Sequence, residues 1–188
     1  MLRPRLIPSL LLRDECIIKT IQFNKFQYIG DPCNTVRIFN ELEVDELFLN
    51  DILASINNQK PNFKLLKDIA NECFMPLAYG GGIKCLDDAK QLFDIGFEKI
   101  LLNTNAIINP RLISEIATQY GSQAVVISID VKKTLLSGKK VFNFSGKKNT
   151  NLDPLLWAKE VEGRGSGEIL LTSIDQEGTW GGFDLELT

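Results

Sequence analysis

A short segment near residue 50 recurs near residue 170, and this repeat limits the folds open to the chain. In residues 44–51 and again in residues 166–173, a glutamate precedes an apolar run that ends in polar residues. A weaker pair, residues 5–11 and 124–130, has nearly the same separation of about 120 residues, which indicates a fold built from two similar halves. Two such halves give roughly 240 residues, a common size for an eight-unit βα barrel.

The composition is that of an ordinary globular domain. The chain has 188 residues, 44% of them hydrophobic and 24% charged, which is enough to bury a sizeable core. Its net charge of −3 and the lack of a long basic run argue against nucleic acid as a partner. The apolar stretch at the N-terminus is too short for a signal peptide or a membrane span.

The cysteine and histidine content limits the metal sites and the acid–base groups that the chain can have. The four cysteines lie far apart without a CxxC pair, and the chain has no histidine. We therefore expect no metal site and no cofactor, and we interpret the cysteines as reduced thiols of a cytoplasmic protein. Without histidine, acid–base chemistry would fall to Asp, Glu, Lys, Cys or Tyr.

Apolar runs alternate with amphipathic stretches, the order expected of βα units around a parallel sheet. The predicted strands are residues 5–11, 46–51, 75–79, 99–102, 124–130 and 168–173. The sequence thus predicts the α/β class: an incomplete TIM-type (βα) barrel with about six of its eight units. We expect one domain over residues 1–188, with the last two βα units absent.

Local signals define helix starts and two long loops. Asp31, Asn109 and Asp153 each precede a proline, which predicts an N-cap residue followed by the first residue of a helix. Residues 12–30 and 131–150 follow the first and fifth predicted strands and are longer than a barrel needs. Within the second loop, residues 141–144 predict a hairpin arm.

In a parallel barrel the carboxyl ends of the strands meet at one face, so the residue that closes each apolar run is a candidate for function. The strongest signal is Gly80-Gly81-Gly82, with Asn103 and Thr104 at the next strand end. Glycines let the backbone approach an anion, and Asn and Thr add donors, so this group predicts a phosphate site. The alternative is an ordinary turn between a strand and a helix.

Other strand ends carry weaker signals. Asp130 closes the most hydrophobic run, where burial would raise its pKa and suit it to proton transfer; the alternative is an Asp that caps the next loop. Thr172, Ser173 and the loop to Gly178 could form part of a second anion site. Lys19 could orient a substrate or simply cover the surface.

Four charged residues stand at predicted strand starts: Arg5, Glu46, Lys99 and Glu168. They could form a ring that closes the opposite end of the barrel, but the residues alone favour scattered surface charges.

These motifs together resemble the cyclase subunit of imidazole glycerol phosphate synthase, a barrel that accepts ammonia from a glutaminase. The motifs that carry the resemblance are Gly30-Asp31-Pro32, Asp45-Glu46-Leu47, Gly80-Gly81-Gly82-Ile83, Ser145-Gly146-Lys147-Lys148-Asn149-Thr150 and Gly167-Glu168-Ile169-Leu170-Leu171-Thr172-Ser173. The resemblance implies that ammonia is joined to a phosphorylated ribulosyl-aminoimidazole, which is then cleaved and closed in histidine biosynthesis.

The resemblance also implies roles for single residues. It makes Asp130 a catalytic aspartate, with Lys19 and Asp51 on the active-site face. It implies that Gly82, Asn103 and Thr104 form one phosphate site. The further residues that we predict for substrate phosphate binding are Gly81, Thr172, Ser173 and Gly178. It turns Arg5, Glu46, Lys99 and Glu168 into an ammonia gate, with a glutaminase partner bound at the N-terminal face of the barrel.

One departure from the family pattern affects the chemistry directly. Where the family has Cys-Leu-Asp at the end of the first strand, this chain has Ser9-Leu10-Leu11, so the second catalytic carboxylate is replaced by a hydrocarbon. The opening residues 3–12 resemble a divergent branch linked to the amidination of surface sugars. An alternative function is therefore an ammonia-channelling subunit that serves a sugar amidotransferase and lacks cyclase activity.

Overall fold

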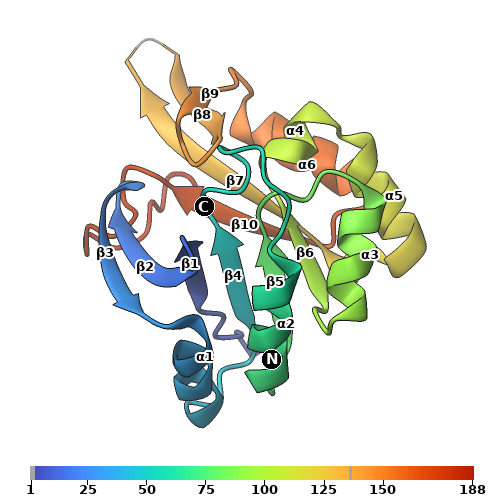
Figure 1. The fold of residues 1–188 in the computed structure, drawn as a ribbon. Helices are drawn as coiled ribbons and strands as arrows, with labels where there is room; N and C mark the ends of the chain where they lie inside the picture. The colour runs from blue at the N-terminus through green and yellow to red at the C-terminus, as the bar shows by residue number, and fades with distance from the viewer. Residues whose placement is uncertain (1–2, 136) are drawn as a thin grey trace. The chain divides into compact units, whose positions relative to one another are not determined.

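The computed structural model describes residues 3–135 and 137–188, which divide into two compact units (Figure 1). The first unit holds the chain up to Ile18 together with Tyr28–Ile100, and the second holds Lys19–Gln27 and Leu101–Thr188. Strand β6 (Lys99–Leu102) begins in the first unit and ends in the second.

Three parallel strands form the centre of the first unit. Strand β4 (Leu47–Asp51) lies between β1 (Ser9–Arg13) and β5 (Leu77–Gly80), and all four residues of β5 are buried. An antiparallel partner, β2 (Cys16–Ile21), joins β1 through a tight turn and leads into β3 (Asn24–Gly30). The apolar runs of β4 and β5 are thus covered on both faces, as in parallel βα folds.

Three amphipathic helices pack their apolar sides into the first unit. They are α1 (Pro32–Glu41), α2 (Phe63–Glu72) and α3 (Leu86–Asp94). Val36, Leu66, Ile69, Ala89 and Leu92 are at most 1% exposed. The apolar sides of these helices are therefore part of the core.

The second unit is built around the long strand β7 (Val125–Thr134). It pairs in parallel with β10 (Glu168–Ser173) and antiparallel with β8 (Gly138–Asn143), which carries the short β9 (Lys148–Asn149). The helical elements here are α4 (Thr104–Ile108), α5 (Arg111–Tyr120), the 3-10 turn η1 (Ser122–Ala124) and α6 (Pro154–Gly163). Side chains of α5 and α6 such as Ile113, Ile116 and Val161 are fully buried.

The predicted α/β class with parallel βα units is confirmed. This architecture is consistent with a partial TIM-type barrel. The strands predicted at residues 99–102 and 168–173 have the predicted limits. The first strand was placed too early, because it begins at Ser9, and the predicted loop at 12–30 is wrong, because it contains β2 and β3. The predicted hairpin arm at 141–144 is part of β8 and the turn after it.

Two of the three predicted helix starts are confirmed. The carboxylate of Asp31 accepts from Asn34 N at 2.9 Å before α1, and that of Asp153 accepts from Leu155 N and Leu156 N before α6. The third differs: α5 begins at Arg111 with Pro110 as its cap residue, and Asn109 contributes only its carbonyl, which accepts from Leu112 N at 3.1 Å. Among the described residues, no helix is both long and apolar enough to cross a membrane.

We expect Asp153→Ala to lower the free energy of unfolding by about 1 kcal/mol, because two backbone N–H groups of α6 lose their acceptor. Urea unfolding followed by circular dichroism measures this. Asp94→Ala, an exposed position at the end of α3, is the matched control and should change stability by less than about 0.5 kcal/mol. Equal losses in the two variants would contradict the capping role.

Candidate active site

Asp130 lies inside β7 and is the centre of a polar network in the second unit. Its side chain is only 7% exposed. Its Oδ1 accepts from Ser128 Oγ at 3.2 Å, and its Oδ2 accepts from Asn103 Nδ2 at 3.2 Å. Contrary to the sequence prediction, Asp130 does not close its strand, which continues to Thr134. Both carboxylate oxygens are therefore held by donors from the protein.

Burial raises the pKa of Asp130 to about 7, and the hydrogen bond from Ser128 opposes this shift. A carboxyl group with this pKa is partly protonated at neutral pH and can either donate or accept a proton. In a chain without histidine, this is the group best matched to acid–base chemistry.

Strand register decides which predicted residues share a face with Asp130. Thr172 of β10 lies directly beside it, and Phe142 of β8 lies on its other side. Ser173 pairs with Val131 and so points to the opposite face, where its Oγ donates to Asp184 Oδ2 at 3.1 Å. The predicted pair Thr172 and Ser173 is thus divided between two faces.

The glycine turn after β5 is sterically restricted. A Cβ on Gly81 would lie 2.6 Å from Asp51 O, and a Cβ on Gly82 would lie 2.5 Å from Gln59 O. Both glycines have positive φ, so no other residue fits without movement of the backbone. The Gly82 N–H points to Ser55 Oγ at 3.4 Å.

Asp51 ends β4 on the face opposite Asn50. Its Oδ1 accepts from Leu53 N and Ala54 N, both at 2.9 Å, so the carboxylate holds the loop that follows it. Burial raises its pKa, the two backbone bonds lower it, and Asp14 raises it slightly.

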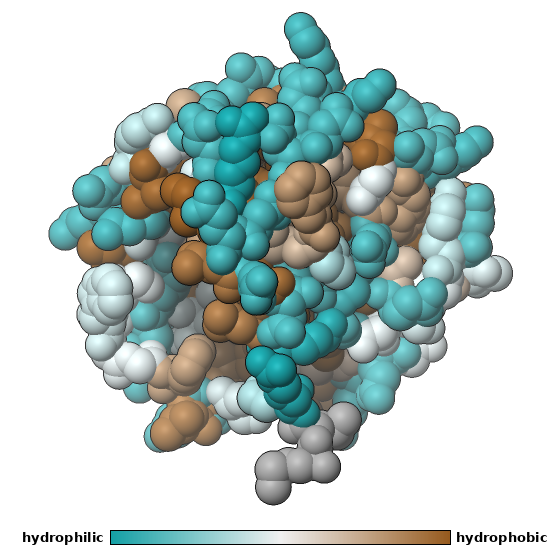
Figure 2. Space-filling view, turned by 90° about the horizontal axis from the view of Figure 1, so that it is seen from below, coloured by the Kyte–Doolittle hydropathy of each residue, from teal (hydrophilic) through white to brown (hydrophobic). Residues whose placement is uncertain are grey.

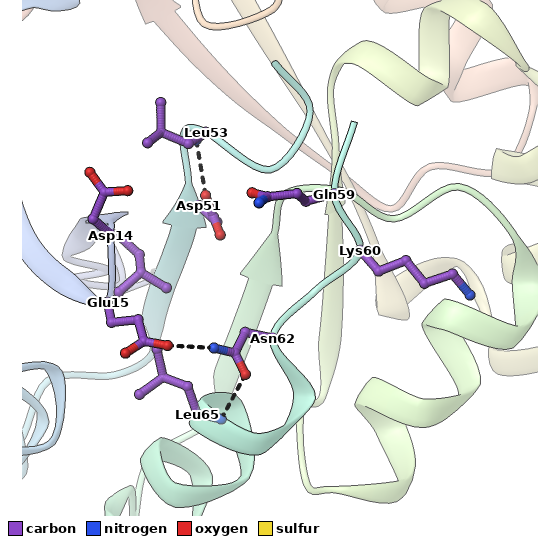
Figure 3. A pocket seen from close by; sticks show the side chains of 9 residues that line it. Asp14, Glu15, Asp51, Leu53, Gln59, Lys60, Asn62 and Leu65 are labelled. Atoms are coloured by element: carbon purple, nitrogen blue, oxygen red, sulfur yellow. Dashed lines mark hydrogen bonds between the residues drawn. The ribbon is translucent and has the colours of Figure 1, made fainter. Parts of the chain in front are cut away.

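A cavity of about 410 Å³ opens beside Asp51 (Figure 3). Its lining consists of Leu12, Asp14, Glu15, Asp51, Leu53, Gln59, Lys60, Asn62 and Leu65. The ammonium group of Lys60 points away from it and pairs with Asp88 at 3.3 Å. The remaining charges are carboxylates, so this cavity does not suit a phosphate group.

Leu11 lies on the face of β1 that it shares with Ser9. Its partner on β4 is Asn50, whose Nδ2 donates to Ser9 Oγ at 3.0 Å. A half-buried hydrocarbon therefore occupies a position with polar neighbours on both strands. The Leu11 side chain has no atom that can exchange a proton. It therefore cannot take the role of the carboxylate that the resemblance implies at this position.

Three of the four predicted gate residues meet in the first unit. Glu46 is 2% exposed, and its Oε2 accepts from Arg5 Nη1 at 3.0 Å and from Lys99 Nζ at 2.8 Å. Its Oε1 is buried and has no hydrogen-bond partner among the described residues. Glu168 begins β10 in the second unit.

The remaining candidates, Lys19 and Gly178, belong to the second unit. Lys19 is exposed on β2. Gly178 packs against the Thr20 carbonyl, where a Cβ would collide, and the neighbouring Glu177 accepts from Thr20 Oγ1 at 2.8 Å and from Phe23 N at 2.9 Å. Gly178 therefore has a close-packing role in this loop.

Ser128 is a site residue that the sequence reasoning missed. A signal was present, because a serine two positions before Asp130 interrupts an otherwise apolar run and must share its face. Its hydroxyl is one of the two groups that bind the Asp130 carboxylate.

These features define a protein of the partial βα-barrel class with a buried carboxyl group of raised pKa. A model of the family described as histidine biosynthesis protein matches residues 5–188, and the chain belongs to this family. It is 50% identical over 184 residues to a Pseudomonas aeruginosa protein named, provisionally, imidazole glycerol phosphate synthase subunit hisF2; the match covers 98% of this chain and 73% of that protein.

Two further relatives agree with this assignment. A Leptospira borgpetersenii protein, provisionally named imidazole glycerol phosphate synthase subunit HisF, is 51% identical over all of this chain and 74% of its own length. The imidazole glycerol phosphate synthase subunit HisF of Hydrogenobaculum is 42% identical over all of this chain and 75% of its own length. The chain thus spans about three quarters of these relatives.

We expect Asp130→Asn to stabilise the fold at about pH 8. The pKa of an ordinary carboxyl group is about 4, whereas that of Asp130 in the folded chain is about 7. Between these two pH values, Asp130 is protonated in the folded chain and ionised in the unfolded chain. Stability of the natural protein therefore falls as pH rises through this window, by up to about 4 kcal/mol. Asparagine is neutral at every pH, so the Asp130→Asn variant does not lose this stability.

Urea unfolding at a series of pH values checks this. Asp130→Asn and the natural protein should have equal stability below about pH 4 and diverge above it. Asp94→Asn, an exposed control, should follow the natural protein throughout. Parallel curves for Asp130→Asn and the natural protein would contradict a raised pKa.

Proposed function

We propose that the chain is a cytoplasmic cyclase-type subunit of imidazole glycerol phosphate synthase. It would use ammonia from a glutaminase partner on a phosphorylated ribulosyl-aminoimidazole substrate. The observation that carries this proposal is the buried Asp130, with a pKa of about 7 and both oxygens held by donors. This is the state required of a group that must both accept and donate a proton.

In this proposal Asp130 moves the protons of ring closure and bond cleavage. Ser128 and Asn103 fix the carboxylate plane, so a substrate proton would meet an oxygen lone pair that the two donors leave free. Gly81 and Gly82 would admit a substrate phosphate to the backbone, and Thr172, beside Asp130, would add a hydroxyl. Lys19 and Asp51 keep the substrate-orienting roles that the resemblance implies.

Ammonia would enter past the cluster of Arg5, Glu46 and Lys99, with Glu168 as its fourth member. The buried Glu46 carboxylate and its two cations support this role, because a compact ion cluster can open and close around a small neutral molecule. The glutaminase would bind at the N-terminal ends of the strands, where Glu46 and Lys99 lie.

One observation favours a second candidate function. Leu11 supplies no acid or base on the first strand, although its neighbours Ser9 and Asn50 are polar. An ammonia-conducting subunit of a sugar amidotransferase complex would need the gate but not two catalytic carboxylates. The branch that makes acetamidino sugars would then provide the acceptor enzyme.

We expect Leu11→Asp to raise turnover of the imidazole precursor with ammonium salt by about 10²-fold or more, because a general acid or base typically contributes that much. The assay uses the protein at its full natural length and detects the imidazole product. Leu11→Asn is the matched control, since it has the same shape as Asp but no ionisable proton.

Measurable basal turnover, enhanced by Asp and not by Asn, supports the cyclase. No turnover in the natural protein or in either variant contradicts it and leaves the ammonia-conducting function. Equal gains in both variants would show that polarity, and not proton transfer, limits the reaction.

A further inference from the structure

The side chains of Thr104 and Asn103 form a chain of hydrogen bonds that ends on Asp130. Thr104 Oγ1 donates to Asn103 Oδ1 at 3.3 Å, and Asn103 Nδ2 donates to Asp130 Oδ2 at 3.2 Å and to Ser128 O at 3.0 Å. Thr104 is 5% exposed and Asp130 is 7% exposed. The chain therefore runs through the interior of the second unit.

The other end of this chain is anchored on the backbone after β8. Phe144 N donates to Thr104 Oγ1 at 3.1 Å, and the hydroxyl proton of Thr104 is donated to Asn103 Oδ1. Phe144 and Ser145 both have positive φ and form the tight turn that leads to Gly146. The direction of donation is thus fixed from Phe144 to Thr104, then to Asn103, and finally to Asp130.

This arrangement uses up the side-chain donors that the sequence assigned to a phosphate. The single hydroxyl proton of Thr104 is already given to Asn103, and the Asn103 amide donates to Ser128 O and Asp130. An anion that took these donors would have to break bonds inside the protein. The side-chain donors of both residues are therefore engaged within the protein.

We infer that Thr104 is a positioning residue for Asp130: its hydroxyl connects the turn after β8 to the Asn103 amide and so fixes the orientation of the Asp130 carboxylate. Any effect of Thr104 on catalysis rests on the proposed acid–base role of Asp130. The positioning of the Asp130 carboxylate is independent of that role, because it concerns contacts within the folded chain. It also extends to Asn103, which is the direct donor.

The orientation of an asparagine amide requires a partner at each end. Asn103 caps the short α4 without a side-chain cap bond, so the amide is not held by the helix. Without the Thr104 hydroxyl, Oδ1 loses this donor, and only the two bonds from Nδ2 to Ser128 O and to Asp130 hold the amide. The bond to Asp130 would then be less well aligned, and the ionised carboxylate would lose part of its stabilisation.

Thr104→Val tests this inference, because valine keeps the branched shape and removes the hydroxyl. The readout is a ¹³C NMR titration of the Asp130 carboxyl carbon in the full chain. We expect the titration midpoint to move upward by about half a pH unit to one pH unit. Thr104→Ser restores the hydroxyl and should return the midpoint to that of the natural protein.

Thr150→Val is the matched control, since Thr150 Oγ1 donates to Val141 O at 2.7 Å outside the chain of bonds. Its Asp130 midpoint should not move. An unchanged midpoint in a folded Thr104→Val, or a failure of Thr104→Ser to restore it, overturns the inference.

A measurement on the natural protein covers the case in which Thr104→Val does not fold. The side-chain amide resonances of Asn103 should shift with the Asp130 titration, while those of Asn149, exposed on β9, should not. Absence of that coupling overturns the inference. These readouts need no turnover, so they fail or succeed independently of the cyclase proposal.

Where turnover is measurable, the kinetics separate positioning from phosphate binding. Thr104→Val should lower kcat and shift its pH profile with little change in KM. A raised KM with an unchanged kcat would instead assign Thr104 to the substrate phosphate and overturn the positioning role.

Discussion

The register of the parallel strands decides which side chains share a face, and the chemistry of each unit depends on it. Because successive residues alternate between faces, Asp130 and Thr172 lie side by side while Ser173 is turned away. In the same way Leu11 and Asn50 share a face, and Asp51 lies on the other one beside Leu12. A shift of one residue in either pairing would exchange these sets.

Desolvation is the main cause of the raised pKa of Asp130. Its neighbours along β7, Ile129 and Val131, are buried hydrocarbons, and burial of the carboxylate raises its pKa. Ser128 and Asn103 offset part of this cost by donating to both oxygens. Neither burial nor hydrogen bonding alone would bring the pKa of Asp130 close to 7. Full burial without donors would keep the carboxyl group protonated, and strong hydrogen bonding without burial would keep it ionised.

Much of this arrangement could be predicted from the sequence, and the failures have local causes. Continuous apolar runs fixed β6 and β10, and the Asp-Pro pairs at 31–32 and 153–154 fixed two helix starts. Strands β2 and β3 were missed because of their turns: the turn from β1 to β2 uses Asp14 and Glu15, and the turn from β2 to β3 uses Gln22 and Phe23, all at positive φ. Such turns normally carry Asn-Gly or Asp-Gly, so the usual signal was absent.

The candidate site was predicted less completely, because residue type does not specify which atoms a side chain will bind. Asn103 and Thr104 were correctly expected near a strand end, but their donors are engaged by Asp130 and by each other. Gly81 and Gly82 were expected to cradle an anion, and their fit against the loop after β4 adds a packing reason for glycine. Contacts between segments distant in sequence decide these roles, and a single sequence does not contain them.

The ion cluster at Glu46 contributes little to the stability of the fold. A buried carboxylate with two cations gains little net free energy, because desolvation offsets most of the attraction, and apolar residues of similar volume would pack as stably. Its second oxygen also lacks a hydrogen-bond partner among the described residues, which is a further cost. Fold stability therefore does not account for these charges, which is consistent with the proposed role in passing ammonia. That role would serve either of the two candidate functions. Leu11 bears on the cyclase alone, because its side chain removes a group that could exchange a proton on the first strand.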